Sequence, residues 1–238
     1  RPENIEDPQN IDLLVVLDAS TYERIGCVGP LLSHASIVNI DHHISNTHFA
    51  DLLFLDANAA ATGEIITDLT RVWNTPISPS MANALYMAIV ADCGFFKFSN
   101  TTEKTLDAGA YCVASGADTQ AVADIIETTT VKRLKATAQI LSNVSFFENN
   151  RIAMLSLTPR DMELVEGDTD GLVDFIRNVE HVEVAVVLKG KTNEITRVSL
   201  RSKGVDVNAV AGKFGGGGHI RAAGCTVHAN LEESSHKI

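Results

Sequence analysis

The chain has 238 residues, of which 19 are lysine or arginine and 30 are aspartate or glutamate, so its formal net charge is −11. The hydrophobic content of 45% excludes an intrinsically disordered chain. The acidic balance argues against a broad electropositive groove for long duplex nucleic acid, since such binding depends on neutralising many phosphates. A short anionic ligand held by a few local cations remains compatible with this charge. The length predicts two domains.

Nothing in the sequence indicates a membrane span or an export signal. No apolar run approaches the roughly 18 residues of a spanning helix, and the start RPENIEDPQN lacks the basic and apolar segments of a signal peptide. The four cysteines are scattered without C-x-x-C spacing, which is typical of reduced thiols and argues against a cysteine zinc site. We therefore expect a cytoplasmic protein. Because the chain enters LLVVL soon after Arg1, we expect its N-terminal part to be absent.

Two short apolar runs come first in the chain, LLVVL at 13–17 and IVNI at 37–40. Both have the length of a strand, and the amphipathic segment between them has room for a crossover helix. We interpret this stretch as a βαβ unit with parallel, buried strands. Ligands of such sheets gather outside the carboxyl ends of the strands, where Asp18 and Asp41 lie.

Helical patterns follow the second strand. Thr62 is placed to cap a helix over GEIITDLTRVW, whose apolar residues, Val72 and Trp73 included, share one face. A second helix from about Ser80 contains MANALYMAIVAD and ends at Asp92. Further helical pattern runs through TLDAGAYCVASG and TQAVADIIETTTVKRLKATAQILSNV.

The pattern changes after FFENN, where strands become the dominant prediction. RIAMLSL, VEVAVVLKG and EITRVSLRSK have the character of strands, and KGKTNE is a polar hairpin loop between the last two. VDVNAVAGKF predicts a short helix that runs into GGGGHIRAAGCTV. We therefore expect one domain over residues 1–122, a helical connector over 123–149 and a second α/β domain over 150–238.

The acid and the two histidines that follow the second strand are candidate metal ligands. Imidazole and carboxylate together suit Mn, Fe or Zn, although Asp41, His42 and His43 also fit a satisfied surface group. Asp18 alone fits a turn residue or a helix cap. Asp92 fits a helix break before a glycine, but a carboxylate at a helix C-terminus is unfavourable unless a cation lies nearby.

The glycine run at 215–218 is a candidate anion site. Alone it fits a flexible hinge. Followed by His219 and Arg221, it lets backbone N–H groups approach an anion while two side chains supply donors. Together with SLRSK at 199–203, the run indicates a site for a phosphate or a nucleotide.

Four motifs carry a family resemblance: LDAS, DHH, ADCGFFKFSNTT and FGGGGHIRAAG. Their order and approximate spacing resemble those of the DHH/DHHA1 phosphoesterases, in the branch of nano-RNases and 3′-phosphoadenosine 5′-phosphate (pAp) phosphatases. The resemblance implies an α/β fold, with a parallel-sheet DHH domain, a smaller α/β DHHA1 domain and the active site in the cleft between them. It also implies a hydrolase, a manganese-dependent phosphodiesterase or phosphatase for short oligoribonucleotides, pAp or linear dinucleotides, and a homodimer.

The same resemblance assigns roles to residues. Asp18 would bridge two manganese ions, with His42 and Asp92 completing the shell of one of them. His43 would approach the scissile phosphate, and Asp41 would orient a histidine. The substrate would be held by residues of the second domain, namely Arg201, Ser202, Gly216, Gly217, Gly218, His219 and Arg221. Two metals in such a site can activate a water and stabilise both the attacking and the leaving oxygen.

The sequence departs from the family pattern in two places. The motif H-x-x-P-D-x-D, which supplies three further metal ligands in the family, does not occur in it. The remaining ligands furnish most of a shell for only one ion, so we expect two ions in the intact protein and little activity from this chain alone. The family's T-D-T-G reads ADCG here, and we expect Cys93 to be a packing residue.

Two other functions stay open on the sequence. One is a related enzyme, either a pyrophosphatase or a single-strand DNA exonuclease. The GGGGH segment argues against the first of these and the short chain against the second. A catalytically silent nucleotide-binding module is the other alternative, favoured by the absent motif.

Overall fold

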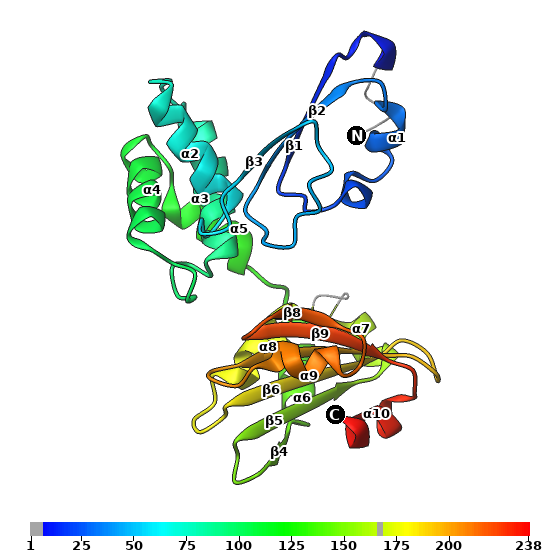
Figure 1. The fold of residues 1–238 in the computed structure, drawn as a ribbon. Coiled ribbons are helices and arrows are strands. Elements are labelled where there is room, and N and C mark those ends of the chain that lie inside the picture. The colour runs from blue at the N-terminus through cyan, green and yellow to red at the C-terminus, as the bar shows by residue number, and fades with distance from the viewer. Residues whose placement is uncertain (1–6, 166–168) are drawn as a thin grey trace. The chain divides into compact units, whose positions relative to one another are not determined.

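The computed structural model describes residues 7–165 and 169–238, and it divides the chain into two compact units, Arg1–Thr128 and Thr129–Ile238 (Figure 1). We describe each unit by itself. Within the described ranges, none of the helices has both the length and the apolar content that crossing a membrane requires.

The first unit is built on a parallel sheet in the order β1-β2-β3, with β1 at Leu13–Leu17, β2 at Ser36–Asp41 and β3 at Leu52–Leu55. All pairings are parallel, as predicted for the first two strands. The prediction that these strands are buried is wrong for β1, where Leu13, Val15 and Leu17 are exposed. The third strand was not predicted, because the sequence before it is polar. Leu17 lies opposite Ile40, and Asp41 lies opposite Leu55, so the carboxyl ends of the strands meet at one edge.

The predicted crossover helix between the first two strands is wrong. The described segment between them holds only two short helical turns, η3 at Tyr22–Ile25 and α1 at Val28–Leu31. A further short turn, η2 at Pro8–Asn10, precedes β1. Gly26 ends η3 with a φ of 63°, a left-handed conformation that a continuous helix cannot contain.

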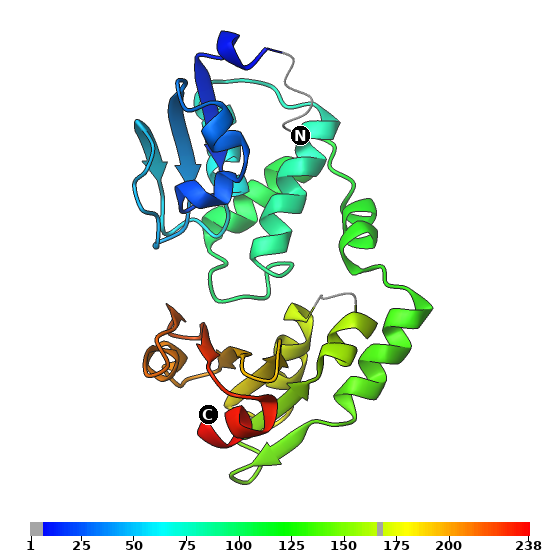
Figure 2. The ribbon, with the colours of Figure 1, turned by 90° about the vertical axis from the view of Figure 1, so that its right-hand side faces the viewer.

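A helical layer follows the sheet: α2 at Thr62–Val72, α3 at Pro79–Asp92, α4 at Glu103–Ala114 and α5 at Thr119–Glu127. Figure 2 shows α2 to α4 gathered on one side of the parallel sheet. Residues from α3, α4 and α5 meet in a buried cluster that includes Ile89, Val90 and Cys93, so the prediction that Cys93 packs in the interior is confirmed. The apolar face predicted for α2 is shorter than expected, since Val72 and Trp73 at its end are exposed.

The second unit is a mixed six-stranded sheet in the order β4-β5-β6-β7-β9-β8. The strands are β4 at Ser145–Phe147, β5 at Ile152–Leu157, β6 at Val184–Gly190, β7 at Thr196–Ser202, β8 at Gly217–His219 and β9 at Ala222–Val227. Only β5 and β6 pair in parallel, and the others are antiparallel. The helices are α6 at Val131–Leu141, α7 at Pro159–Leu164, α8 at Asp170–Arg177, α9 at Val207–Gly212 and α10 at Leu231–Lys237.

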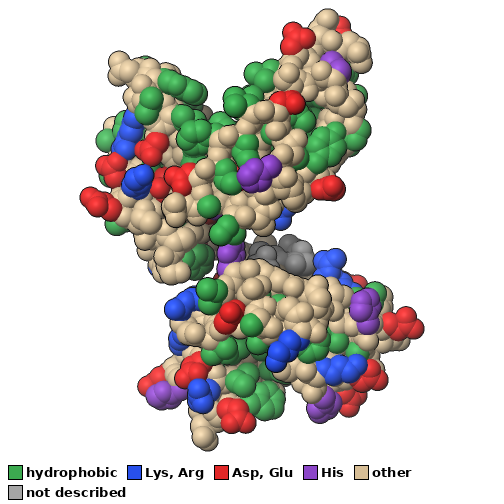
Figure 3. Space-filling model, in the orientation of Figure 1, with side chains coloured by type: hydrophobic (Ala, Val, Ile, Leu, Met, Phe, Trp, Pro, Cys, Tyr) green, Lys and Arg blue, Asp and Glu red, His purple; other side chains and the backbone are tan. Residues whose placement is uncertain are grey.

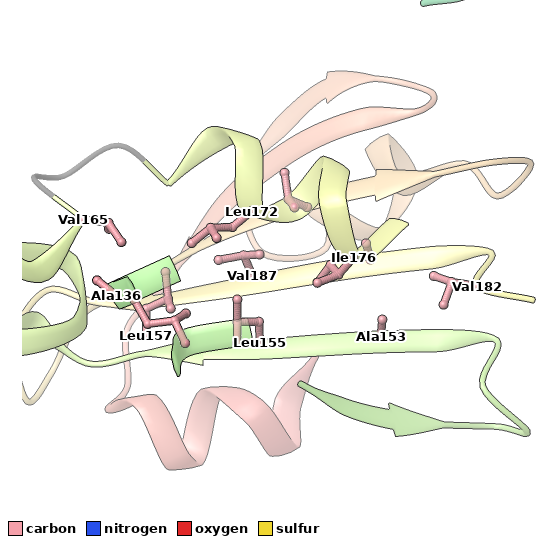
Figure 4. Close-up of a cluster of buried hydrophobic side chains, with 12 residues drawn as sticks. Ala136, Ala153, Leu155, Leu157, Val165, Leu172, Ile176, Val182 and Val187 are labelled. Atoms are coloured by element: carbon pink, nitrogen blue, oxygen red, sulfur yellow. The ribbon is translucent and has the colours of Figure 1, made fainter. Parts of the chain in front are cut away.

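Each face of this sheet has its own core. Leu155, Leu157 and Val187 pack against α6, α7 and α8 on one face (Figure 4). Leu188, Val198 and Leu200 form the core of the other face with α9. Because neighbouring residues of a strand point to opposite faces, the alternating burial of β7 separates its core residues from the side chains of its other face.

The connector predicted over residues 123–149 is divided between the two units. The helical pattern is interrupted at Thr128, a residue with extended backbone, and Thr130 caps α6 by accepting a hydrogen bond from the backbone N–H of Arg133. Three consecutive β-branched threonines disfavour a continuous helix. Ala136 and Ile140 of α6 belong to the core of the second unit.

Gly63 allows α2 and α3 to approach closely, since a Cβ there would lie 2.9 Å from the Cβ of Ala88. Gly63→Ala should therefore lower the free energy of unfolding by about 1–3 kcal/mol, despite the better helix propensity of alanine. The control is Gly171→Ala in α8, where a Cβ meets no atom within 4 Å, and a gain of up to about 1 kcal/mol is expected. Urea denaturation followed by circular dichroism measures both. Equal effects of the two changes would contradict the close approach.

Candidate functional site

Asp18 lies immediately after β1, at the carboxyl edge of the parallel sheet. Its φ is 61°, a left-handed conformation that is uncommon for residues other than glycine. Two hydrogen bonds fix it there: its backbone N–H donates to the carbonyl of Ile40 at 3.1 Å, and the hydroxyl of Thr62 donates to its Oδ1 at 2.8 Å. The carboxylate is thus held in place while its side chain stays half exposed.

The sequence predicted that Thr62 caps α2, and this prediction is wrong. Ala61 is the residue at the cap position, no side chain caps the helix, and the hydroxyl of Thr62 faces Asp18 instead. The prediction was wrong because the partner of this hydroxyl comes from β1, 44 positions earlier in the chain.

His42 stands between two carboxylates. Its Nε2 lies 3.5 Å from Oδ1 of Asp18 and 3.7 Å from Oδ2 of Asp92. Its Nδ1 lies 3.2 Å from the carbonyl oxygen of Ala59. Because a carbonyl oxygen only accepts, this contact favours the tautomer with the proton on Nδ1, which leaves the lone pair of Nε2 directed at the carboxylates. This is the arrangement of a metal-binding histidine held by a hydrogen bond on its other nitrogen.

Asp41 is fully buried at the end of β2 and organises the loop that follows it. One oxygen lies 2.7 Å from Nδ1 of His43 and accepts from the backbone N–H of His42, and the other accepts from the side-chain amide of Asn46. Burial raises the pKa of Asp41, but the hydrogen bonds from His43 and Asn46 outweigh it, so the pKa lies below its usual value. Asp41 therefore stays ionised and orients His43.

Asp92 ends α3 and faces the same site. Burial raises its pKa, and the negative charge of Asp18 raises it further. Such a position favours a nearby cation, as expected from the helix C-terminus. The amide of Asn100 donates to the backbone carbonyls of Asp92 and Ala60 at 3.2 Å each, which ties the start of the α3–α4 loop to the segment before α2.

The residues present fit a divalent metal. Asp18, His42 and His43 each offer one ligand atom, and these three atoms lie within 4.8 Å of one another. Asp92 lies next to this group, with its Oδ2 at 3.7 Å from Nε2 of His42. Nitrogen and carboxylate oxygen donors of this kind suit Mn, Fe or Zn. Sequence reasoning missed two described residues that hold the acidic side chains of the site: Thr62, which donates to Asp18, and Asn46, which donates to Asp41. Neither lies in a motif with metal-ligand spacing.

The predicted substrate residues of the second unit lie around β7, β8 and β9. Gly217, Gly218 and His219 form β8, Arg221 is exposed in the turn after it, and Arg201 lies on β7 with its Nε 3.8 Å from Oδ1 of Asp174. Ser202 is different. It is buried and its hydroxyl donates to the carbonyl of Val205, so it holds the turn after β7 and presents no group to a ligand.

The glycine run forms part of the sheet, which explains why glycine is needed there. A Cβ on Gly216 would lie 2.2 Å from the carbonyl oxygen of Gly224, and one on Gly218 would lie 2.5 Å from that of Ala222. Gly218 also has a φ of 151°. Glycine therefore lets β8 approach β9, rather than serving as a hinge.

Comparisons with known proteins identify the family. The DHHA1 domain profile matches residues 149–238. The bifunctional oligoribonuclease and PAP phosphatase NrnA of Thermus thermophilus is 34% identical over 94% of this chain and 68% of its own length. The chain belongs to this family. The Bacillus subtilis protein of the same name is 29% identical over 91% of the chain and 70% of its own length.

A solved structure has a similar fold. An exopolyphosphatase-related protein from Bacteroides fragilis superposes with a TM-score of 0.84 at 23% identity, over 96% of this chain and 70% of that protein. This likeness concerns the fold alone. The predicted family is confirmed. The predicted α/β class, with a parallel sheet in the first domain and an α/β second domain, is confirmed as well, and the structure adds that the second sheet is mixed.

Thr62→Val removes the hydrogen bond to Asp18 while keeping the size of the side chain. We expect the affinity for Mn²⁺ to fall at least about tenfold, as for other residues that support a metal ligand. Thr62→Ser keeps the hydroxyl and should bind nearly as the unsubstituted protein does. Titration calorimetry with Mn²⁺ measures both. Equal affinities in the valine and serine variants would show that the hydroxyl does not position Asp18.

Proposed function

We propose that this protein hydrolyses phosphoester bonds in short oligoribonucleotides and in pAp, with manganese held by Asp18, His42 and Asp92. The observation that carries the proposal is the placement of His42, whose Nδ1 contacts the carbonyl of Ala59 while Nε2 faces two carboxylates. Membership of the oligoribonuclease and PAP phosphatase family supports the choice of substrates.

The bound cations would supply Lewis acidity, which stabilises negative charge on phosphate oxygens and lowers the pKa of water. The chain's own residues prepare the site for that chemistry. Asp18 and Asp92 bring two carboxylates close to Nε2 of His42. Their negative charges repel each other, and a bound divalent cation would compensate this repulsion. The hydrogen bonds from Thr62 and Ile40 keep Asp18 in position before any ligand arrives.

His43 has a different task from His42 in this proposal. Its Nδ1 is engaged with Asp41 at 2.7 Å, which fixes the ring and leaves Nε2 for a substrate. When the ring is protonated on both nitrogens, Nε2 can donate to a phosphate oxygen or give its proton to the leaving oxygen, which leaves the neutral ring with its remaining proton on Nδ1. Asp41 acts through His43 because it is itself buried and out of reach of a substrate.

The second unit would bind the substrate. Exposed His219 and Arg221 flank the turn after β8, and the guanidinium of Arg201 lies on the face of β7 that does not enter the α9 core. Guanidinium groups and strand-edge N–H groups are suitable donors for a phosphate. The proposal also includes a cytoplasmic location and a homodimer. The four free cysteines accord with the first, and the family resemblance alone suggests the second.

In this chain, for which little activity is expected, His42→Ala should lower the remaining turnover by about a hundredfold or more and reduce bound manganese, because it removes the nitrogen between the two carboxylates. His34→Ala, which changes an exposed histidine of the same unit, is the control and should behave as the unsubstituted protein does. Rates on a dinucleotide and elemental analysis of metal measure the effect. Full hydrolytic activity in excess chelator would contradict the proposal. Substrate binding without hydrolysis would instead favour a silent nucleotide-binding module.

If the second unit binds one terminal phosphate or nucleotide of the substrate, the protein should prefer short RNA. Arg221→Ala should raise KM for a dinucleotide about tenfold, the loss expected for a charge-assisted hydrogen bond, and leave the metal content unchanged. Arg160→Ala, at an exposed arginine of α7, is the control. Rates are compared for RNA of two and about twenty nucleotides. Equal rates on both lengths would contradict the terminal grip.

A further inference from the structure

Two buried asparagines lie behind the candidate metal site. Asn39 is inside β2, where it is 0% exposed, and Asn46 lies in the loop after β2, where it is 7% exposed. Asparagine is depleted in strands, and an amide that is buried without hydrogen bonds is unfavourable. The partners of the two amides therefore indicate what the pair does.

The amide of Asn46 makes three hydrogen bonds. Its nitrogen donates to Oδ2 of Asp41 at 2.6 Å and to Oδ1 of Asn39 at 2.8 Å. Its oxygen accepts from the backbone N–H of His48 at 2.8 Å. Because a carboxylate only accepts and a backbone N–H only donates, these partners allow one orientation of the amide and exclude the flipped one. Both N–H groups of Asn46 are thus occupied.

Asn39 extends this chain of hydrogen bonds to the first strand. Its nitrogen donates to the backbone carbonyl of Val16 at 3.2 Å, and Val16 lies opposite Asn39 in the register of β1 with β2. Val16 comes two residues before Asp18. The amide pair therefore connects the backbone of β1, just ahead of Asp18, with the carboxylate of Asp41.

Asp41 relates this connection to both histidines. Its Oδ1 lies 2.7 Å from Nδ1 of His43 and accepts from the backbone N–H of His42 at 2.9 Å. Because Asn46 holds Oδ2, the carboxylate is restrained from rotating, and Oδ1 stays opposite these two groups. Figure 3 shows histidine side chains at the visible surface of the first unit, whereas the two asparagines are buried and can act only through other residues.

We infer that Asn46 and Asn39 are positioning residues, which keep the carboxylate after β1 and the histidines after β2 at the separation that lets them bind one divalent cation. The inference rests on the proposed function because it concerns the same site, but it makes a statement about cation binding that needs no hydrolysis. Loss of the Asn46 amide leaves Oδ2 of Asp41 without this donor and releases the loop after β2 from β1.

The first test measures Mn²⁺ affinity by titration calorimetry on the full chain, without substrate. Asn46→Leu keeps the approximate size of the side chain and removes its donors, so the affinity should fall at least about tenfold, as for other residues that support metal ligands. Asn39→Leu should also weaken binding. Because both amides belong to one chain of hydrogen bonds, the double variant should lose no more affinity than Asn46→Leu alone.

The second test follows the ring of His43 in the metal-free protein, by NMR with nitrogen-15-labelled histidine. The signals of His43 are assigned from their absence in His43→Gln. At a pH of about 8.5, above the ordinary pKa range of histidine, the ring of the unsubstituted protein should hold its proton on Nδ1. Asn46→Leu should give a mixture of the two tautomers, since the carboxylate of Asp41 is no longer held opposite Nδ1.

Thr70→Val is the matched control, because it removes another buried hydrogen bond of the first unit, from the hydroxyl of Thr70 to the carbonyl of Thr67. It should change neither the Mn²⁺ affinity nor the ring of His43. Circular dichroism establishes that each variant is folded. If Asn46→Leu does not fold, Asn46→Ser is measured in its place, and it should also weaken Mn²⁺ binding because its shorter side chain cannot reach both partners.

A Mn²⁺ affinity and a His43 tautomer in the Asn46 variant equal to those of the control would overturn the inference, as would losses that add in the double variant. Hydrolysis of a dinucleotide by the unsubstituted protein with manganese is measured in parallel. If hydrolysis occurs and the Asn46 variant binds Mn²⁺ normally, the positioning role fails and the proposed function stands. If the expected losses occur and the unsubstituted protein hydrolyses nothing, the proposed function fails and the positioning role stands.

Discussion

The carboxylate of Asp41 is the group on which the arrangement of the candidate metal site depends. It is buried at the end of a parallel strand and compensated by hydrogen bonds from the His43 ring, the His42 backbone and the Asn46 amide. A buried charge without such partners would be strongly unfavourable. These hydrogen bonds favour the conformation of the loop after β2 that supplies the donors, and this conformation positions both histidines.

Parallel pairing brings the remaining acid groups to the same place. The register of β1 with β2 sets Asp18 beside the end of β2, and Thr62 at the start of α2 holds its carboxylate. Buried Glu64, two residues further along, accepts hydrogen bonds from the backbone N–H of Ala60 and the hydroxyl of Thr105. These bonds anchor the segment that carries the carbonyl partner of His42. The site is thus built from strand ends, helix ends and buried polar contacts, rather than from one loop.

In the proposed function the second unit has a different task, since it would offer donors to an anion in a chain with net negative charge. It does so with a sheet edge where glycines allow two strands to approach and with an alternating strand that keeps its apolar residues in one core. Charges of one sign on the other face of such a strand are spaced by the strand geometry. Short anionic ligands match this pattern better than long duplexes, for which many more cations are needed.

The sequence by itself determined the strands at LLVVL and EITRVSLRSK, the helix that ends at Asp92, and the family, because apolar periodicity and ordered motifs are local properties of the chain. It also indicated that Asp18, His42 and Asp92 belong together, through the resemblance. Only the tertiary structure decided which partner each polar group has. The hydroxyl of Thr62 suits a helix cap in the sequence, and it faces Asp18 because a strand far away in the chain delivers that carboxylate. Ser202 is buried for the same reason, since burial depends on what packs over a residue and not on the motif that contains it.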